Sequence, residues 1–510
     1  MAKIMVHRTY IAINDYNLGD KVYLEHYLST YDKAYFRYNP IGYIYDEVNR
    51  VLKIPRGVSI NQLEKSFNCV AQVDYNYTPY YNFAKPISLK YMPRDEDQME
   101  AIKFILGIDR YQMNQRKSML SLNLNTGKGK TYCAIASMAY MGVTSAIISP
   151  MSDLMDQWHD FFLEYTDIDP NRIYRIAGSA SIDKLFLRPA GSYDIYICSH
   201  DTLNSYGKNN GWEKINELFT YLGIGYKFFD EAHMEFENMF AIDCSTNVYK
   251  TIYLTATMGR SDYEEDQIFQ TYFNGTPSID LFDRDKDPHT QYIAIKYNSK
   301  PSPLDIEACR NGYGLKRPAY TNYVVDQYNF ESILYIIMEK ILKSEGKWLI
   351  YVGTNEAIMK VRDWIHYHYP SMIGLVGVYT SIVDPNIKSN QLNKKVILST
   401  TKSAGAAMDI KGLTKTVNLA EPFKSRVLAQ QTLGRTRADN TQYLDIVDLG
   451  FDQTRRFYNF KRPIFSKYAT ECKEIILGDN DLNAERRKIE ESRKGLWSPI
   501  LFEDDCKFTE

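Results

Sequence analysis

Apolar residues in the first half of this chain follow patterns that predict the strands and helices of a parallel α/β sheet. Residues 120–125 alternate leucine with serine or asparagine, which is the period-two pattern of a strand. Residues 130–140 have the composition of a helix that starts directly after the following turn. The run Tyr-Lys-Phe-Phe at 226–229 is typical of a short strand buried on both faces.

Further apolar runs predict a second sheet later in the chain. Residues 293–297, 348–354 and 443–448 each have the length and composition of a buried strand. Near the N-terminus, residues 51–57 predict a strand that ends in a turn. Residues 485–494 alternate acidic and basic side chains at a spacing that stabilises an exposed helix.

The turn after the strand at 120–125 is a candidate phosphate-binding loop. A Gly-Lys-Thr turn between a strand and a helix directs backbone N–H groups and the helix dipole at phosphate oxygens. Lys130 would neutralise the outer phosphates and Thr131 would hold Mg²⁺. The candidate nucleotide-binding residues are Thr126, Gly127, Lys128, Gly129, Lys130 and Thr131. Leu124 stands where the full pattern has its first glycine, and the alternative is a surface turn with a lysine.

A pair of acidic residues follows the aromatic run at 226–229. Asp230 could hold the water shell of a metal ion, and Glu231 could orient and deprotonate an attacking water. Since ligands bind at the carboxyl ends of parallel strands, we expect Lys130 and this acidic pair at one edge of the sheet. The alternative is an exposed acidic helix cap. For His233, a role in coupling is favoured over a core histidine.

With these two motifs in place, residues 91–450 resemble a superfamily 2 helicase of the DEAH-box type, because further segments occur in the order found in that superfamily. The resemblance implies that Gln98 reads adenine, that Gly405, Asp409 and Arg435 contact the nucleotide, and that Thr255, Thr257 and Gln431 couple hydrolysis to strand handling. It also implies nucleic-acid contacts from Pro150, Gln157, Trp158, Ser199, His200, Thr354, Thr400 and Ser403.

The segment Gln431–Arg437 resembles the helicase motif that carries an arginine finger. The final arginine of that motif would fall on Ala438, whereas this chain has Arg437. Arg435 and Arg437 are therefore both candidates, and the sequence leaves open which one contacts the γ-phosphate. An arginine from a second domain can stabilise the charge on the transferring phosphoryl group once the domains close over the nucleotide. Hydrolysis would then reopen the hinge.

Composition limits where this protein works and how it binds. The net charge of −2 lacks the basic excess of a general nucleic-acid binder, so we expect binding in a confined basic groove. Basic residues after the last predicted strand, including Lys461, could touch DNA, but the favoured expectation is that they are solvated. Neither a signal peptide nor an apolar run long enough for a membrane span is evident. The seven cysteines stand singly, which favours a reducing, cytoplasmic setting without a zinc ribbon.

The predicted fold class is α/β, and the resemblance implies two tandem RecA-like parallel-sheet domains of the P-loop NTPase type with a small N-terminal α+β accessory domain. The expected boundaries are 1–90 for the accessory domain, 91–285 and 326–465 for the two motor domains, 286–325 for their connection and 466–510 for a tail. Aromatic residues at 31–38 and eleven basic against eight acidic residues in 1–90 suit nucleic-acid stacking. A packed sheet face is the favoured alternative for those aromatics.

Within superfamily 2, the chain resembles the phage UvsW and XPB/RecG-like group. This resemblance implies an ATP- and Mg²⁺-dependent helicase that moves 3′→5′ and remodels branched DNA by fork regression, branch migration or R-loop unwinding in replication, recombination and repair. It also implies a phage-encoded protein in the host cytoplasm with single-stranded or branched DNA, or RNA–DNA hybrids, as partners and no membrane. We expect a monomer. The alternatives are an RNA helicase and a non-hydrolysing nucleic-acid scaffold; a restriction-type motor with a nuclease is disfavoured because no nuclease motif is evident.

Overall fold

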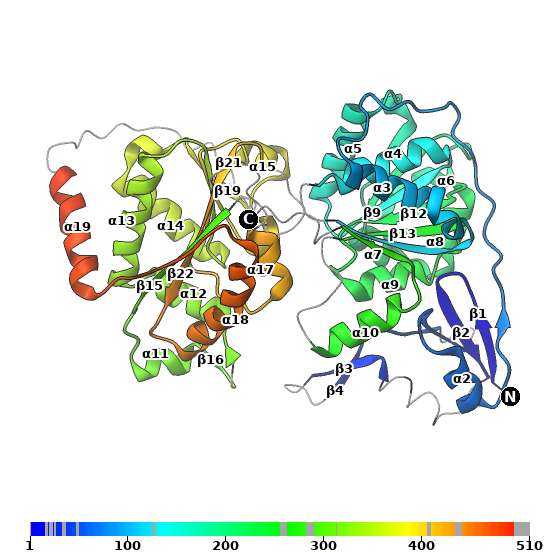
Figure 1. Ribbon diagram of the computed structural model, residues 1–510, viewed down its shortest axis with the longest axis horizontal. Coiled ribbons are helices and arrows are strands. Elements are labelled where there is room, and N and C mark those ends of the chain that lie inside the picture. Colours follow the sequence, from blue (N-terminus) through cyan, green and yellow to red (C-terminus); the bar gives the residue numbers. More distant parts are fainter. Residues whose placement is uncertain are drawn as a thin grey trace. The chain divides into compact units, whose positions relative to one another are not determined.

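The computed structural model describes residues 2–15, 19, 24, 27–32, 37–46, 50–124, 128–255, 263–281, 290–312, 314–404, 410–433 and 441–493. The chain divides into two compact units, Met1–Arg284 and Asp285–Glu510. Figure 1 shows a central sheet flanked by helices in each of them.

The first unit is built on a seven-stranded sheet in which every neighbouring pair is parallel. The strand order is β10-β11-β9-β12-β13-β8-β14. The predicted strands at 120–125 and 226–229 are β8 and β12 of this sheet. The strands are β8 (Met119–Asn123), β9 (Ser145–Ser149), β10 (Ile173–Ile176), β11 (Ile195–Ser199), β12 (Tyr226–Phe229), β13 (Lys250–Thr255) and β14 (Ser278–Asp280).

Helices cover both faces of this sheet, as the βαβ connections require. The predicted helix at 130–140 is α4 (Lys130–Met141), which lies between two left-handed glycines, Gly129 and Gly142. The other helices of the unit after residue 90 are α3 (Glu96–Leu106), η1 (Asp109–Arg116), α5 (Asp153–Tyr165), η2 (Pro170–Arg172), α6 (Ser179–Phe186), α7 (His200–Asn210), α8 (Glu213–Tyr221), α9 (Phe236–Asp243) and α10 (Tyr263–Phe273).

The N-terminal residues form a smaller sheet in the same unit, with strand order β5-β6-β2-β1-β7. Its apolar face packs against α9 and α10, so residues such as Ile11 and Leu52 belong to one core with Phe240 and Phe269. The elements are β1 (Lys3–Val6), β2 (Tyr10–Asn14), β5 (Ile44–Asp46), β6 (Val51–Pro55), α2 (Ile60–Phe67), β7 (Gln72–Val73) and the separate hairpin of β3 (Ser29–Asp32) and β4 (Arg37–Pro40).

The second unit has its own seven-stranded, all-parallel sheet, in the order β19-β20-β18-β21-β22-β15-β23. The predicted strands at 293–297, 348–354 and 443–448 are β15, β18 and β22. The strands are β15 (Thr290–Tyr297), β18 (Lys347–Tyr351), β19 (Val376–Tyr379), β20 (Val396–Ser399), β21 (Leu413–Asn418), β22 (Thr441–Asp448) and β23 (Cys472–Ile476).

The helices of the second unit include α19, which lies beside α13 (Figure 1). Arg486 of α19 pairs with Glu331 at 2.6 Å and lies 4.2 Å above the ring of Tyr328. The expected tail therefore contributes an edge strand and a packed helix to this unit. The helices are α11 (Pro303–Ala308), α12 (Arg317–Val325), α13 (Tyr328–Leu342), α14 (Asn355–His368), η3 (Pro370–Met372), α15 (Pro385–Gln391), α16 (Thr401–Ala404), α17 (Arg426–Leu433), α18 (Asp452–Tyr468) and α19 (Asp479–Arg493), with a β16 (Arg310–Asn311) and β17 (Gly314–Leu315) hairpin.

Taken together, the two parallel sheets confirm the predicted fold class of tandem RecA-like domains with an N-terminal α+β region. No helix in the described ranges combines the length and the apolar character that a bilayer crossing needs.

Candidate functional site

Five strands of the first unit deliver predicted site residues to the carboxyl edge of one sheet. Strand β8 leads into the phosphate loop, and β12 leads into Asp230 and Glu231. Strands β9, β11 and β13 end at Ser149, Ser199 and Thr255. Parallel strands place all these ends on the same side, which is the edge where ligands bind in open α/β sheets.

Lys130 and Glu231 meet at this edge as a buried ion pair. The Lys130 Nζ lies 2.9 Å from Glu231 Oε1, and the two residues are 8% and 3% exposed. Lys130 is the first residue of α4, so its backbone N–H belongs to the unpaired first turn of the helix. The structure thus brings the predicted phosphate-binding lysine and the predicted base together across 101 residues of sequence.

Asp230 is held by two hydrogen bonds. The indole Nε1–H of Trp158 donates to Asp230 Oδ2 at 2.8 Å, and the backbone N–H of Glu231 donates to Oδ1 at 3.0 Å. Burial, followed by the neighbouring Glu231 charge, raises the pKa of Asp230 to about 6, although Lys130 and Trp158 act in the opposite direction. The site therefore holds two buried carboxyl groups against one ammonium group.

This charge balance fits a divalent cation. Asp230 and Thr131 are the residues that would hold it, and a cation would offset the charge that Lys130 leaves uncompensated. Mg²⁺ usually binds through one or two carboxylates plus substrate phosphates, without a cage made wholly of protein. Consistent with this, the described residues contain no group of three or more His, Cys, Asp or Glu side chains arranged as a metal site.

Gln98, which lies on α3, forms a hydrogen bond to the phosphate loop. Its Nε2 donates to the Lys128 carbonyl at 3.0 Å, and its Oε1 accepts from the Arg94 N–H at 2.8 Å. A Cβ atom at Gly129 would lie only 2.3 Å from Gln98 Nε2. An adenine base would have to bond to the same side-chain amide, which already bonds to Lys128 and Arg94. The adenine contact of Gln98 therefore stays a prediction.

His233 lies between the acidic loop and the end of β13. Its Nδ1 is 2.9 Å from Thr255 Oγ1 and 3.4 Å from Glu231 Oε2. This contact joins two of the predicted coupling residues directly to the predicted base. Thr257, another predicted coupling residue, lies outside the described residues.

The predicted nucleic-acid contacts of the first unit are less exposed than a binding surface requires. Trp158 and His200 are 2% and 0% exposed, and the Trp158 N–H is already bonded to Asp230. Pro150 is also buried, and Ser199 caps α7 by accepting a bond from the Thr202 N–H. Of this group, Gln157 is half-exposed. Side-chain contacts from Trp158 or His200 to a strand would need a rearrangement of the segment.

In the second unit, the predicted contacts also lie at the carboxyl edge of the sheet. Thr354 caps α14, where its Oγ1 accepts from the Ala357 N–H at 3.1 Å. Thr400 and Ser403 bond to each other at the start of α16, and Gln431 lies in α17. The remaining predicted site residues lie outside the described residues: Thr126, Gly127, Gly405, Asp409, Arg435 and Arg437.

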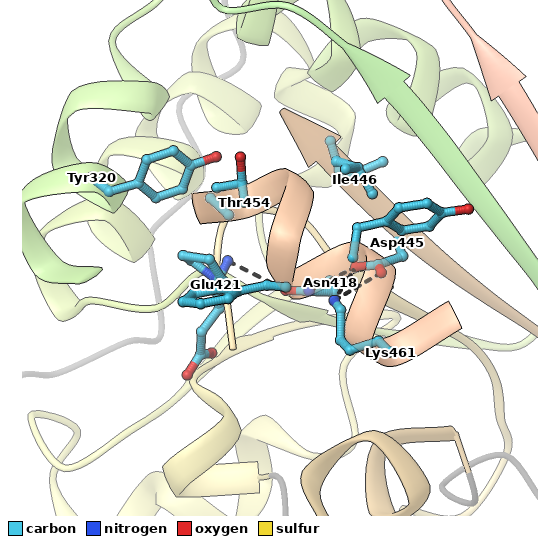
Figure 2. A pocket seen from close by; sticks show the side chains of 12 residues that line it. Tyr320, Asn418, Glu421, Asp445, Ile446, Thr454 and Lys461 are labelled. Atoms are coloured by element: carbon cyan, nitrogen blue, oxygen red, sulfur yellow. Dashed lines mark hydrogen bonds and ion pairs between the residues drawn. The ribbon is translucent and has the colours of Figure 1, made fainter. Parts of the chain in front are cut away.

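Residues that sequence reasoning missed line a small pocket at this edge, which Figure 2 shows. Glu421 Oε2 accepts from the Thr401 N–H at 2.7 Å, so the carboxylate anchors the first turn of α16. Burial raises the pKa of Glu421. The sequence signal that could have identified Glu421 as a site residue is its position three residues beyond the carboxyl end of β21.

The same pocket corrects the expectation for Lys461. This residue is 4% exposed and lies 2.8 Å from Asp445, which also accepts a hydrogen bond from Asn418 at 2.8 Å (Figure 2). The expectation of a solvated lysine was wrong because α18 turns this side chain into the core of the unit. The basic residues around Lys461 in the sequence do not indicate that its partner is the buried carboxylate of Asp445.

Residues 91–260 match the family described as type III restriction enzyme, res subunit. This match covers the segment that contains the phosphate loop, Asp230 and Glu231. No curated protein sequence matches the chain.

Solved structures with similar folds include two proteins with TM-scores of 0.5 or more. Dbp5 from S. cerevisiae bound to RNA and ADP BeF3 has 13% identity and a TM-score of 0.54, over 78% of this chain and 93% of Dbp5. The ATP-dependent type ISP restriction-modification enzyme LlaBIII bound to DNA has 12% identity and a TM-score of 0.50, over 79% of this chain and 33% of LlaBIII. T4 UvsW aligns over 93% of this chain and 99% of its own length at 14% identity and a TM-score of 0.36.

At these identities the structural matches show the fold alone. The fold and the match over residues 91–260 together support an ATP-hydrolysing enzyme of the helicase class.

Proposed function

We propose that this protein is an ATP-dependent DNA helicase or translocase that remodels branched DNA, moving 3′→5′. The observation that carries the proposal is the buried group of Lys130, Asp230 and Glu231 at the carboxyl edge of the first sheet. This group has the residue types that phosphoryl transfer to water requires: a cation for the phosphates, a carboxylate for a metal and a second carboxylate for the nucleophile.

The ion pair of Lys130 with Glu231 has a consequence for the reaction. While the two side chains are paired, the lysine is turned toward the carboxylate, and Glu231 Oε1 is occupied by the ammonium group. Phosphate oxygens that enter the loop would compete for Lys130 and leave Glu231 available to accept a proton from water. A cation bound at Asp230 and Thr131 would neutralise charge on the phosphates.

We propose that two contacts of the catalytic carboxylates couple ATP hydrolysis to the binding of a nucleic-acid strand. His233 links Glu231 with Thr255, and Trp158 links Asp230 with α5. The segment 150–158 is also the one whose residues are predicted to contact the strand. A movement of α5 on strand binding would therefore act directly on Asp230.

DNA is favoured as the substrate because the matching family and LlaBIII are both restriction enzymes, and the LlaBIII structure contains DNA. Dbp5 binds RNA on the same fold, so an RNA helicase is the outcome to test against. The preference for branched DNA, the 3′→5′ direction and a phage origin rest on the sequence resemblance.

The test compares ATP hydrolysis without nucleic acid and with single-stranded DNA, forked DNA or RNA. Lys130→Ala and Glu231→Gln serve as inactive variants. We expect forked DNA to stimulate turnover more than tenfold, and both variants to lose the stimulated rate. Unwinding of duplexes with a 3′ or a 5′ tail then tests the direction of movement.

Stimulation by RNA alone would replace the DNA proposal with an RNA helicase. ATP binding without turnover on any substrate would indicate a non-hydrolysing scaffold.

Arg435 and Arg437 are proposed as alternative finger residues on the basis of the resemblance. Single Lys substitutions of each would identify the finger, because lysine keeps the charge but lacks the planar fork that contacts phosphate oxygens. We expect one variant to lose most of the stimulated rate while it still binds ATP. Equal, small effects of both would remove the finger assignment from this segment.

A further inference from the structure

A groove in the second unit lies at the end of the sheet opposite to the predicted strand contacts Thr354, Thr400 and Ser403. It has a volume of about 660 Å³ and is lined by α13, α19 and residues in the first half of β18, β21 and β22. Figure 1 shows α13 and α19 running alongside each other.

Four lysines and two glutamates line the groove, so its formal charge is +2 in a chain whose net charge is −2. Two lysines have acidic partners: Lys343 lies 3.5 Å from Glu339, and Lys488 lies 2.9 Å from Glu485. Lys340 and Lys415 have no ion pair with any residue that the structure describes. The groove thus holds two uncompensated cations close together.

Lys415 is the more constrained of these two cations. It is half-buried on β21, and its burial, together with the charge of Lys340, lowers the pKa of Lys415. Like charges that approach in a partly desolvated site raise the free energy of both charged forms. An anion placed between them would relieve this repulsion and accept charge-assisted hydrogen bonds.

The floor of the groove is apolar. Trp348 is buried, and its Nε1–H donates to Ser344 Oγ at 2.7 Å, which fixes the ring. Ile336 and Ile489 complete the floor, while Lys340, Lys343 and Lys488 are exposed at the rim. A charged rim above an apolar floor suits a ligand that combines phosphates with less polar sugars or bases.

The groove is separated from the predicted strand contacts Thr354, Thr400 and Ser403 of the same unit by the length of the sheet. Strand β18 begins beside the groove at Lys347 and ends at Tyr351, three residues before Thr354. Five residues of strand span roughly 16 Å. Substitutions in the groove therefore leave the residues at the carboxyl edge in place.

We propose that this groove is a second nucleic-acid site, in which Lys340 and Lys415 bind the sugar-phosphate backbone of a DNA segment distinct from the strand at the carboxyl edges. The proposal rests on the proposed function, because it assumes that the protein engages DNA. A volume of about 660 Å³ far exceeds one phosphate ion, which favours a backbone segment. A second contact would let the protein hold another arm of a branched DNA.

The experiment measures DNA binding by the full chain as a function of salt concentration. The variant Lys340→Gln/Lys415→Gln is compared with wild type and with Lys214→Gln/Lys360→Gln, which removes the same charge from two other helices. Each phosphate contact adds about 0.9 to the slope of log K against log salt for duplex DNA and about 0.7 for single strands. We expect the groove variant to lower the slope on forked DNA by about 1.4 to 1.8, and the control variant to leave it unchanged.

ATP hydrolysis in the absence of DNA should be the same in all three proteins. An unchanged slope in the groove variant, with normal stimulation by forked DNA, would overturn the second site while leaving the proposed function intact. Absence of stimulation in wild type would instead overturn the proposed function. Titration with inorganic pyrophosphate tests whether the groove binds a small phosphate ligand instead. If the groove variant no longer binds pyrophosphate but shows the wild-type salt slope on DNA, the nucleic-acid assignment is overturned.

Discussion

At the scale of single residues, the candidate site depends on side chains that hold the two predicted catalytic carboxylates from outside the two motifs. Trp158 bonds to Asp230, and His233 bonds to Thr255 beside Glu231. Residues that orient a metal ligand typically contribute 10- to 100-fold to metal affinity or activity. The indole of Trp158 is therefore placed to set the orientation of the carboxylate that would meet the metal.

Replacing Trp158 with Phe should lower stimulated ATP hydrolysis by about 10- to 100-fold and raise the Mg²⁺ concentration needed for half-maximal rate. The reason is the loss of the N–H that fixes Asp230 Oδ2. Trp364→Phe is the matched control, because it removes an indole bond to the Glu331 carboxylate at 3.1 Å in the second unit. Equal loss of activity in both variants would show a general effect of losing an indole bond and not a role at the site.

The raised pKa of Asp230, about 6, predicts a pH-dependent metal requirement. An acid whose pKa is higher in the folded than in the unfolded protein binds its proton more tightly when folded. Its contribution to stability is therefore present at low pH and lost as the pH rises from about 4 to about 6. Metal binding has the opposite dependence, because it needs the ionised carboxylate.

We therefore expect the Mg²⁺ concentration for half-maximal ATP hydrolysis to rise about tenfold between pH 7 and pH 5. ATP itself titrates in this range, so the comparison is made with Trp158→Phe. Loss of the indole bond should move the midpoint to higher pH, since that bond lowers the pKa of Asp230. Identical midpoints in both proteins would assign the pH dependence to ATP alone.

At the scale of elements, helix α4 connects the loop to the core. Its two ends are left-handed glycines with different surroundings: a Cβ at Gly129 would contact Gln98 Nε2, whereas a Cβ at Gly142 would meet no atom within 4 Å. The same backbone conformation thus stands beside a crowded side chain at the start of the helix and in open space at its end, where a left-handed glycine terminates the helix.

Substitution of Gly129 by Ala should weaken ATP binding by more than tenfold, because the added methyl group displaces Gln98 and strains the loop. Gly142→Ala places the same strain at the other end of the helix, costs about 1 to 2 kcal/mol of stability and should leave ATP binding unchanged. Binding of a fluorescent ATP analogue and thermal melting separate the two effects. Normal ATP affinity in Gly129→Ala would show that the loop adapts to a side chain at this position.

At the scale of the molecule, each unit contains its own buried ion pair. In the first unit, Lys227 and Asp243 are fully buried 2.5 Å apart, and the backbone of Asp243 and Cys244 accepts bonds from Thr9 and Lys53 of the N-terminal sheet. In the second unit, Lys461 pairs with Asp445. The N-terminal sheet should therefore unfold together with the first parallel sheet, separately from the second unit.

Asp243→Asn should destabilise the first unit by about 3 to 5 kcal/mol, since it leaves a buried ammonium group without its partner. Hydrogen exchange followed by mass spectrometry should show faster exchange in β1, β2 and β12 together and no change in the second unit. Asp445→Asn is the reciprocal control and should affect the second unit alone. Faster exchange in the N-terminal sheet without a change in β12 would show that the two sheets unfold independently.

The sequence predicted the strands β8, β12, β15, β18 and β22 well because each is a short apolar run that ends at polar residues. It also placed Lys130 with Asp230 and Glu231, since the carboxyl ends of parallel strands must share one edge. These conclusions depend on local pattern and on the topology of parallel sheets, which are both encoded in neighbouring residues.

Tertiary structure decided what touches the site. The bond from Trp158 to Asp230, the buried pairing of Lys461 with Asp445 and the anchoring of α16 by Glu421 join residues 16 to 72 positions apart in sequence. The basic groove combines side chains from four separate segments of the second unit. Such contacts depend on how helices pack over the sheet, and no single segment of the sequence records the packing that turns a polar side chain inward or outward.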